Sequence, residues 1–367
     1  MRKRALGLVV VGVAASLVLS ACSSSKSSDK SSAGGSSGGA AKGKVGVILP
    51  DTQTSARWED FDKPLITAAF KAAGVDVDVQ NAQGDKNKMI SIAQAMIQEK
   101  VSVLAIVNLD SASGAQIEAT AKQAGVKTID YDRLTLGGTA DYYVSFDNVA
   151  VGKLQGQGLV NCLTAEKKTA PQIIEINGSP TDNNATLFKQ GYDSVLEPKY
   201  ASGWKKVGDK SIPDWKNVLG GTTFEQLLSA NGGKVDGVLA ANDGLGNAVI
   251  TVLKKTGLKV PVTGQDATVQ GLQNILAGDQ CMTVYKSIKK EAQGLVDLAI
   301  AMLKNEKAQT TGTVKDTQAN RDVPSLLLTP IAITKANVKA VVDDEFVKAS
   351  ALCAGAAAAA CTAAGIK

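Results

Sequence analysis

The sequence predicts an α/β protein with two doubly wound parallel-sheet lobes, and three observations predict it. Apolar residues make up 44% of the 367 residues, yet aromatics make up only 4% and 36 residues are glycine. This composition favours cores of Val, Ile, Leu and Ala over a β-sandwich. From Lys44 onward, short apolar runs alternate with amphipathic segments, which indicates β-α-β units. The rhythm restarts after Tyr142 to Ser145, and two halves of about 100–150 residues each suit two domains.

In the first half, the apolar runs predict strands and the longer segments between them predict helices. Gly74 and Gly125 follow two of these segments, in the position where glycine ends helices. The predicted strands are 45–49, 75–79, 101–107 and 126–131. The predicted helices are about 58–73, 86–98 and 112–124.

The second half repeats this pattern. The predicted strands are 172–176, 205–208, 237–240, 260–263 and 282–285. Helices are expected at about 148–163 and 183–196, on either side of Asn242 and Asp243, and on either side of the last strand. Ligands of such sheets bind at the carboxyl ends of the strands.

The first 22 residues predict export and lipid anchoring. A basic start is followed by the apolar stretch Leu6 to Leu19, whose 14 residues are fewer than the ~20 needed to span a bilayer. The sequence Leu19-Ser20-Ala21-Cys22 resembles the lipobox of bacterial lipoproteins, in which the cysteine is acylated. We therefore expect a signal peptide at 1–21, lipidation of Cys22, and a protein held on the extracytoplasmic face of the cell membrane. An uncleaved membrane helix, or a cleaved signal with an unrelated cysteine, are the alternatives.

Residues 23–43 contain nine Ser and five Gly. Such a stretch cannot form a core, and as a flexible coil it would reach about 25 Å. We expect 22–43 to consist of the lipidated cysteine and a tether.

The charged and titratable residues exclude several classes of function. The chain has no histidine, which excludes Ser-His-Asp and Cys-His catalysis and histidine-ligated zinc. Without Arg2, Lys3 and Arg4 of the signal peptide, 37 basic residues face 35 acidic ones, a formal charge of +2. This balance does not suit nucleic-acid binding. We expect no metal site and no cofactor.

Four further cysteines, Cys162, Cys281, Cys353 and Cys361, could pair outside the cytoplasm in three ways or remain free. Cys353 and Cys361 bracket an alanine-rich segment, so a disulfide between them is possible. The pairing of Cys162 and Cys281 stays open.

Polar clusters follow six of the predicted strands. They are Ala56-Arg57-Trp58, Tyr131-Asp132-Arg133, the segment 179–184, Asn242-Asp243, Gly264-Gln265-Asp266 and Val284-Tyr285-Lys286. Each has a simpler interpretation, since Asp182, Asp243 and Asp266 could be helix N-caps and the two arginines could be solvated surface charges. Their recurrence at strand ends indicates a ligand site.

The charges within these clusters are balanced. Three cations and three carboxylates suit a neutral ligand with many hydroxyls, because each hydroxyl both donates and accepts. They are Arg57, Arg133 and Lys286 with Asp132, Asp182 and Asp266. Trp58 and Trp215 could offer flat apolar faces to a sugar ring, or could instead pack in a core or hinge.

The motifs resemble those of a known family. They are ARW at 56–58, YDR at 131–133, SFDN at 145–148, SPTDNNATLF at 179–188, AND at 241–243, GQDA at 264–267, TVYK at 283–286 and DVPSLLLTPI at 322–331. In this order, across Lys44 to Lys348, they resemble the sugar-binding proteins of ABC importers in the type I periplasmic-binding superfamily. They are most similar to those of the D-xylose-binding proteins.

The resemblance implies two lobes joined by a three-crossing hinge, with the sugar in the cleft between them. Crossings are expected near 145–147, 265–267 and 322–325. The N-terminal lobe would then comprise 44–146 and 267–322. The C-terminal lobe would comprise 147–266 and 323–367, including a C-terminal extension after Lys348 that has no counterpart in the xylose-binding proteins.

The resemblance also assigns the sugar contacts. They are Arg57, Trp58, Asp132, Arg133, Asp182, Asn184, Trp215, Asn242, Asp266 and Lys286. Trp215 lies in a segment that differs from the family pattern, so its assignment depends on alignment through a variable region.

The function implied is that of a monomeric, non-enzymatic protein that captures a monosaccharide, foremost D-xylose, and delivers it to a membrane permease. Another pentose or hexose is the alternative ligand, and presenting sugar to a membrane receptor is the alternative role. A glycosidase is disfavoured because each candidate carboxylate has a neighbouring cation or amide and no motif marks an acid–base pair. A sugar-responsive repressor is disfavoured because an export signal stands where its DNA-binding headpiece would be.

Overall fold

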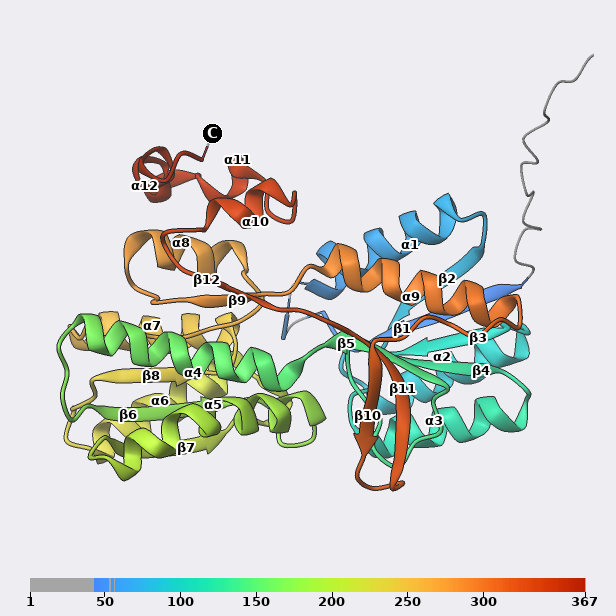
Figure 1. The fold of residues 1–367 in the computed structure, drawn as a ribbon, viewed down its shortest axis with the longest axis horizontal. Helices are drawn as coiled ribbons and strands as arrows, with labels where there is room; N and C mark the ends of the chain where they lie inside the picture. The colour runs from blue at the N-terminus through green and yellow to red at the C-terminus, as the bar shows by residue number, and fades with distance from the viewer. Residues whose placement is uncertain (1–42, 53, 56, 367) are drawn as a thin grey trace, which may run out of the picture. The chain divides into compact units, whose positions relative to one another are not determined.

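Two parallel sheets organise the protein (Figure 1). The computed structural model describes residues 43–52, 54–55 and 57–366, which lie within a compact unit spanning 40–367. The predicted signal peptide, Cys22 and all of the tether before residue 43 lie outside the described residues. The prediction of an α/β fold with two parallel-sheet lobes is confirmed.

The N-terminal lobe is built on a seven-stranded sheet in the order β10-β11-β5-β4-β3-β1-β2, parallel except for the antiparallel β10-β11 pair. Its strands are β1 (Lys44–Leu49), β2 (Asp76–Asn81), β3 (Val103–Ile106), β4 (Lys127–Tyr131), β5 (Tyr142–Phe146), β10 (Gly312–Asp316) and β11 (Arg321–Leu328). Its helices are η1 (Trp58–Asp62), α1 (Lys63–Ala72), α2 (Lys86–Gln98), α3 (Ser111–Gln123) and α9 (Ile288–Leu303).

Helices cover both faces of this sheet, which explains the uninterrupted apolar runs of its strands. In β1, Val47 packs into a cluster with residues of α1 and α9, such as Phe70 and Leu295. The adjacent Ile48 points to the opposite face, where it packs with Met89 of α2 and Ile117 of α3.

The C-terminal lobe contains the parallel sheet β7-β6-β8 and the antiparallel pair β12-β9. Its strands are β6 (Gln172–Asn177), β7 (Lys205–Ser211), β8 (Gly237–Ala240), β9 (Thr283–Tyr285) and β12 (Ile331–Ile333). Its helices are α4 (Asn148–Ala165), α5 (Asn183–Ala201), η2 (Pro213–Trp215), α6 (Asn217–Ala230), α7 (Asp243–Thr256) and α8 (Val269–Ala277). The predicted strand at 260–263 is reduced to a single bridge between Val262 and Val238.

The second chain crossing differs from the prediction near 265–267. Met282 and Val284 are fully buried in the core of the C-terminal lobe, and the Val284 amide donates to the Gly264 carbonyl at 3.2 Å. Because these apolar residues belong to that core, α8 and β9 stay with the C-terminal lobe. Figure 1 shows α9, the next helix, beside α1, so the chain crosses between Tyr285 and Ile288.

The third crossing also differs from the prediction near 322–325. That segment lies inside β11, which pairs in parallel with β5 of the N-terminal lobe. The chain leaves that sheet after Leu328 and enters β12, which pairs with β9. The first crossing runs from β5 into α4, next to Asp147.

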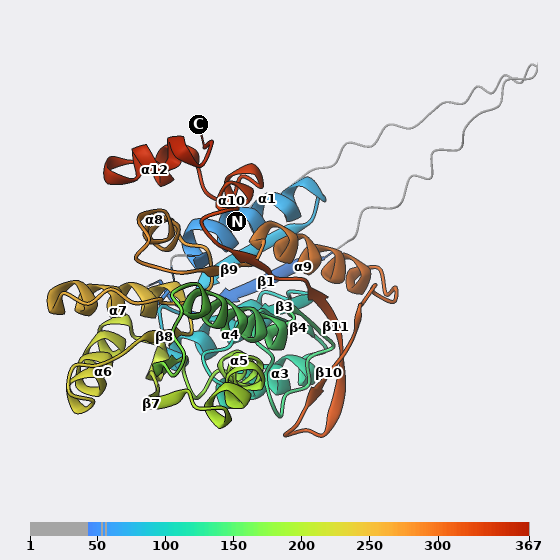
Figure 2. The same ribbon diagram turned by 60° about the vertical axis from the view of Figure 1, so that its left-hand side comes forward.

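The C-terminal extension forms a small helical cap on α8. Its elements are α11 (Ala349–Leu352), η3 (Gly355–Ala357) and α12 (Ala358–Ala363), and α10 (Lys339–Asp343) precedes it. In the views of Figures 1 and 2, this cap lies on the side of α8, with which α11 and α12 are in contact. Leu352 and Cys361 are buried there, and a disulfide joins Cys353 to Cys361.

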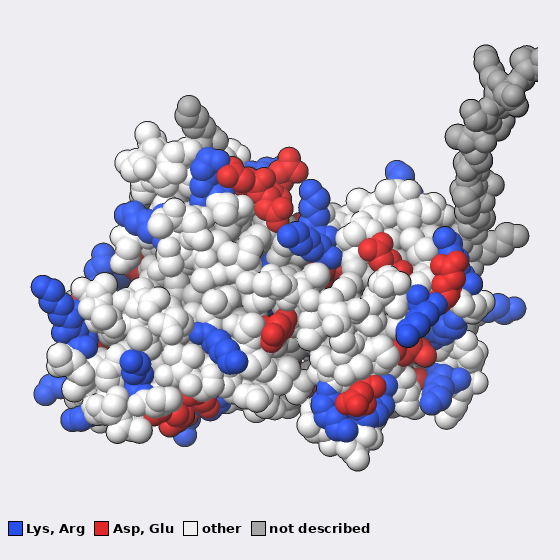
Figure 3. Space-filling model, viewed as in Figure 1, with Lys and Arg blue, Asp and Glu red and all other residues white. Residues whose placement is uncertain are grey.

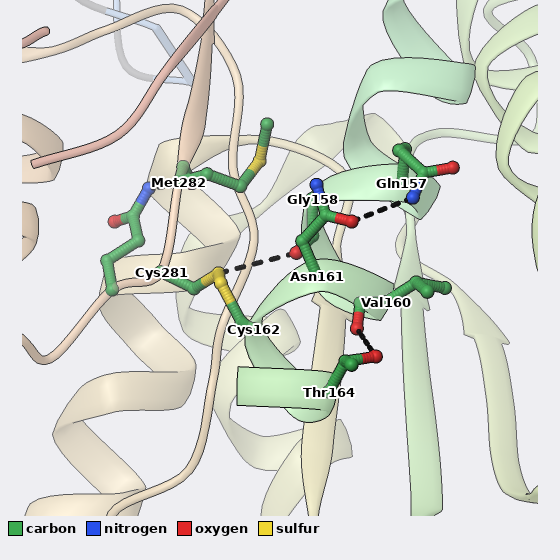
Figure 4. Close-up of a disulfide and its surroundings, with 9 residues drawn as sticks. Gln157, Gly158, Val160, Asn161, Cys162, Thr164, Cys281 and Met282 are labelled. Atoms are coloured by element: carbon green, nitrogen blue, oxygen red, sulfur yellow. Dashed lines mark hydrogen bonds between the residues drawn. A yellow bond between two sulfur atoms is a disulfide. The ribbon is translucent and has the colours of Figure 1, made fainter. Parts of the chain in front are cut away.

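A second disulfide joins Cys162 of α4 to Cys281, immediately before β9 (Figure 4). Both cysteines belong to the C-terminal lobe, and their Cα atoms are 6.5 Å apart. The bond closes a loop with a sequence separation of 119 residues. It therefore ties the segment that leads into the second crossing to the long helix α4.

Charged side chains on the face seen in Figure 3 are interspersed in sign. Over the surface of the protein, charged side chains also form pairs that are largely open to solvent, such as Lys44 with Glu99 and Lys168 with Asp236. Such pairs contribute little to stability, about 0–1 kcal/mol each.

Helices α4 and α5 approach closely through glycines. A methyl group on Gly191 would overlap the carbonyl oxygen of Val149, and one on Gly152 would overlap that of Phe188. We expect Gly191→Ala to lower the free energy of unfolding by about 1–3 kcal/mol, because a backbone would have to shift. Denaturant unfolding of Gly191→Ala and of a control variant measures this effect. The control is Gly312→Ala, since a Cβ there meets no heavy atom within 4 Å, and equal losses in both variants would refute the account.

Candidate functional site

All ten residues predicted to contact a ligand line one cavity between the two lobes. The N-terminal lobe contributes Arg57 and Trp58 at the start of η1, and Asp132 and Arg133 after β4. The C-terminal lobe and the second crossing contribute Asp182, Asn184, Trp215, Asn242, Asp266 and Lys286. Four lining residues were not predicted: Thr54, Ser55, Phe188 and Gln265.

The cavity is small, about 40 Å³, beside the 300–1,000 Å³ typical of pockets that hold small molecules. A second cavity of about 880 Å³ borders it and shares Thr54, Arg133, Asp182 and Trp215. Its outer walls also come from both lobes, with Lys86 on one side and Thr222 on the other. The larger cavity is therefore the mouth of the same cleft.

Arg57 is held by three carboxylates and is only 5% exposed. Its Nε and Nη2 donate to both oxygens of Asp62 at 2.8 Å, Nη1 donates to Asp132 at 2.7 Å, and Nη2 also donates to Glu291 at 2.7 Å. The guanidinium carbon lies 4.2 Å from the ring centroid of Trp58. The interpretation of Arg57 as a solvated surface charge is therefore wrong.

An ion pair between the lobes closes the other side of the cavity. Arg133 Nε lies 3.1 Å from Asp182 Oδ2, and the indole Nε1 of Trp215 donates to the same oxygen at 3.0 Å. Asp182 Oδ1 accepts from the Asn184 amide and caps α5. Asp182 thus acts as a helix cap and also lines the cavity.

Three further polar residues differ in whether they cap a helix, line the cavity or do both. Asn242 lines the cavity and caps α7 by accepting from the Leu245 amide at 2.9 Å. Asp266 caps no helix and instead pairs with Lys286 at 3.1 Å. Asp243 does not line the cavity, and burial, reinforced by the charge of Asp266, raises its pKa to about 7.

The backbone is strained around the cavity. Asp132, Trp215 and Asp266 have φ values of 62°, 56° and 95°, in the left-handed region that disfavours side chains. Each such residue costs about 1–3 kcal/mol, and strain of this kind concentrates where a ligand is held.

Two polar atoms on the lining residues are buried without a hydrogen-bond partner among the described residues. They are the donor Nε1 of Trp58 and the acceptor Oε1 of Gln265. Buried polar atoms are normally paired, so each lacks the partner that such an atom usually has. The cavity lining contains the three cations and three carboxylates of the predicted set. Phe188 adds an apolar surface, and its ring meets that of Trp215 edge-on with 6.4 Å between the ring centroids.

Comparisons with known proteins show the family to which this chain belongs. The sequence matches the periplasmic binding protein domain family over residues 45–307. The chain belongs to this family. It is 36% identical over 307 residues to the D-xylose-binding periplasmic protein of Haemophilus influenzae, an alignment that covers 83% of this chain and 90% of the relative. It is 35% identical over 329 residues to the multiple sugar-binding periplasmic receptor ChvE of Rhizobium radiobacter, covering 85% and 92%.

A solved structure is also similar. It is an ABC transporter solute binding protein from Clostridium phytofermentans with bound β-D-glucose, with a TM-score of 0.77 at 28% identity, covering 84% of this chain and 99% of that one. Like these relatives, the present chain is a solute-binding protein and not an enzyme. Among the described residues, no helix is long and apolar enough to cross a membrane.

The electrostatics of this periplasmic binding protein differ between its buried carboxylates. Burial opposes the ionisation of Asp132, but the charges of Arg57, Lys286 and Arg133 outweigh it and lower the pKa. Burial raises the pKa of Glu291 to about 8, and Arg57 offsets this only in part. The sequence prediction missed both Asp62 and Glu291. A signal for Glu291 exists, because it is an acid on the buried face of α9, beside Ala292 and one turn before Leu295.

Removing the Arg57 guanidinium should be costly, because it leaves three buried carboxylates without their cation. We expect Arg57→Met to lower the free energy of unfolding at pH 7 by about 3–5 kcal/mol. The control is Lys63→Met, which breaks the exposed pair with Glu59 and should cost about 0–1 kcal/mol. Denaturant unfolding compares the two variants, and similar losses would refute a structural role for the Arg57 cluster.

Proposed function

We propose that this protein captures a monosaccharide, foremost D-xylose, between its lobes and delivers it to the permease of an ABC importer. The observation that carries the proposal is the convergence of ten predicted residues from both lobes on one cavity with balanced charges. A neutral polyhydroxylated ring matches such a set, because its hydroxyls donate to the carboxylates and accept from the cations. The names of the relatives support the same ligand class.

The mechanism is a shift between open and closed lobes. A sugar that contacts Asp132 of one lobe and Asp182 of the other favours the closed form, which the permease would recognise. The cavity is too small for a sugar while Arg133 and Asp182 contact each other directly, so hydroxyls of the ligand would replace part of that contact. The three crossings between lobes would act as the hinge.

The preferred sugar is the finer part of the proposal. A pentose and a hexose differ by one hydroxymethyl group, and a pocket discriminates such a difference by about 1–3 kcal/mol. The relative that binds several sugars and the similar structure with bound glucose support a broader range as the second candidate. The relative named as a receptor supports an additional sensory role.

Calorimetric titration tests the ligand. The full chain, kept in mild detergent and refolded to remove bound sugar, is titrated with D-xylose, D-ribose, L-arabinose, D-glucose and D-galactose. We expect saturable binding of D-xylose that falls at least about tenfold in Asp266→Ala, because a hydrogen bond to a charged group contributes about 1.5–3 kcal/mol. Asp297→Ala, an exposed residue of α9 outside the cavity, is the matched control.

The outcomes separate the two levels of the proposal. Binding of another sugar alone would keep the transport role and overturn the xylose assignment. Binding of none of the five would overturn monosaccharide capture. Equal affinity of Asp266→Ala and Asp297→Ala would overturn the site.

The lipid anchor is a separate part of the proposal. We expect the processed chain to begin at an acylated Cys22, followed by a tether that holds the binding protein at the outer face of the membrane. Cys22→Ala should move the protein from the detergent-rich to the aqueous phase in a phase-partitioning assay. Mass spectrometry of the N-terminal peptide identifies the acyl chains, and an unmodified cysteine in the wild type would refute the anchor.

A further inference from the structure

Glu291 lies directly behind the cavity but does not line it. It stands in the first turn of α9, is fully buried, and its Oε2 accepts from Arg57 Nη2 at 2.7 Å. Its other oxygen, Oε1, has no hydrogen-bond partner among the described residues. Glu291 therefore reaches the site only through Arg57.

The charges around Glu291 do not balance. Arg57 faces Asp62, Asp132 and Glu291, so three ionised carboxylates would leave two buried negative charges uncompensated. The other two cations of the site each have a carboxylate of their own, in the pairs Lys286–Asp266 and Arg133–Asp182. Since a buried charge without a partner is strongly disfavoured, the cluster is expected to retain a proton.

The groups that affect the ionisation of Glu291 come from η1, β4, β5 and the segments next to these elements and before α9. The titratable and charged groups facing it are Asp62 of η1, Arg57 before it, Tyr131 of β4, Asp132 after β4, Tyr143 of β5 and Lys286 before α9. The two tyrosines have pKa values raised well above their usual range by burial, so they stay neutral. The proton therefore resides on one of the three carboxyl groups.

Hydrogen bonding indicates which carboxyl group holds it. Asp62 accepts two bonds from Arg57 and one from Tyr131 at 2.6 Å. Asp132 accepts from Arg57 and, at 3.3 Å, from Asn184. Glu291 accepts a single bond, so its ionised form is the least stabilised of the three, in agreement with a pKa of about 8.

We propose that Glu291 is a positioning residue that holds Arg57 while protonated, and that its ionisation weakens sugar binding at alkaline pH. The inference rests on the proposed function, because it requires that the cavity bind a sugar. When Glu291 is neutral, the single positive charge of Arg57 faces only the two negative charges of Asp62 and Asp132, and the net charge of the cluster is closest to zero. An ionised Glu291 adds a negative charge behind Asp132 and draws the guanidinium towards α9.

The direction of the pH dependence follows from linkage. A bound sugar displaces water from the cavity and adds no charge, so it disfavours the ionised form and raises the pKa of Glu291 further. Affinity is then complete below the pKa of the ligand-free protein, about 8, and falls as the pH rises from there towards the pKa of the complex. Binding in that range takes up protons.

The test is calorimetric titration of the full chain with D-xylose and with D-glucose between pH 6.5 and 9.5 at constant ionic strength. We expect the affinity of the sugar that binds to fall about three- to tenfold from pH 7 to pH 9.5. This is the decrease that results if sugar binding raises the pKa of Glu291 by about half to one unit. Repeating the titration at pH 8.5 in two buffers of different ionisation enthalpy should show net proton uptake. The chain contains no histidine that would titrate in the same range.

Three variants assign the effect. Glu291→Gln keeps the shape and is permanently neutral, so it should bind as the wild type does at pH 7 and lose the alkaline decrease. Asp62→Asn should not remove the decrease. Asp243→Asn serves as a control for a second buried acid whose pKa is raised, to about 7, and should also retain the decrease.

Several results would overturn the inference. They are a pH-independent wild-type affinity, no proton uptake, an unchanged decrease in Glu291→Gln, or its loss in Asp62→Asn instead. The proton-uptake measurement uses only the wild type and so stands even where a variant does not fold. Absence of sugar binding at every pH would overturn the proposed function itself, and the inference with it.

Discussion

The site depends on one buried interaction, the guanidinium of Arg57 held by three carboxylates. It connects the start of η1, the end of β4 and the first turn of α9, three segments far apart in the chain. Because each bond fixes a different segment, Arg57 cannot move without disturbing all three. The cavity-lining residues of the N-terminal lobe, here called its half-site, are therefore held in place before a ligand arrives. A preorganised site spends less of its binding free energy on ordering side chains.

The C-terminal lobe achieves rigidity by different means. Its half-site is carried by helix N-caps, since Asp182 and Asn242 each bind a backbone amide of the helix that follows. Gly152 and Gly191 bring α4 and α5 into backbone contact, and the disulfide to Cys281 ties α4 to the segment before the second crossing. In the proposed mechanism, bending would therefore be concentrated in the three short connections between the lobes.

Much of this could be predicted from the sequence, and the exceptions have physical reasons. Polar residues directly after apolar runs mark strand ends, so Arg57, Asp132 and Asp182 could be brought to one cavity without a structure. The crossings at 265–267 and 322–325 were misplaced because lobe membership depends on pairing between distant strands. The apolar residues at 326–328 suit a buried strand of either lobe, and only their pairing with β5 assigns them to the N-terminal lobe.

Glu291 was missed for a related reason. Its place on the apolar face of α9 indicates that Glu291 is buried, but nothing in the helix itself identifies the cation that pairs with it. Its role depends on Arg57, which is 234 residues away in the sequence. Residues whose function is to hold another residue are the hardest to predict, because only the fold brings them together.

The same arrangement bears on how a neutral ligand is selected. Arg133, Asp182, Asp266 and Lys286 already form ion pairs. In the proposed complex, hydrogen bonds from these groups to a sugar would replace part of those pairs, so the net gain in binding free energy would be the difference between the two. Trp58 Nε1 and Gln265 Oε1 have no partner among the described residues and give up no protein contact on binding. A ligand hydroxyl that reached either atom would gain a hydrogen bond without breaking one, whereas a ligand that did not would leave that atom unpaired. Selectivity among sugars of equal charge should then depend more on these two neutral atoms than on the six charged groups around them.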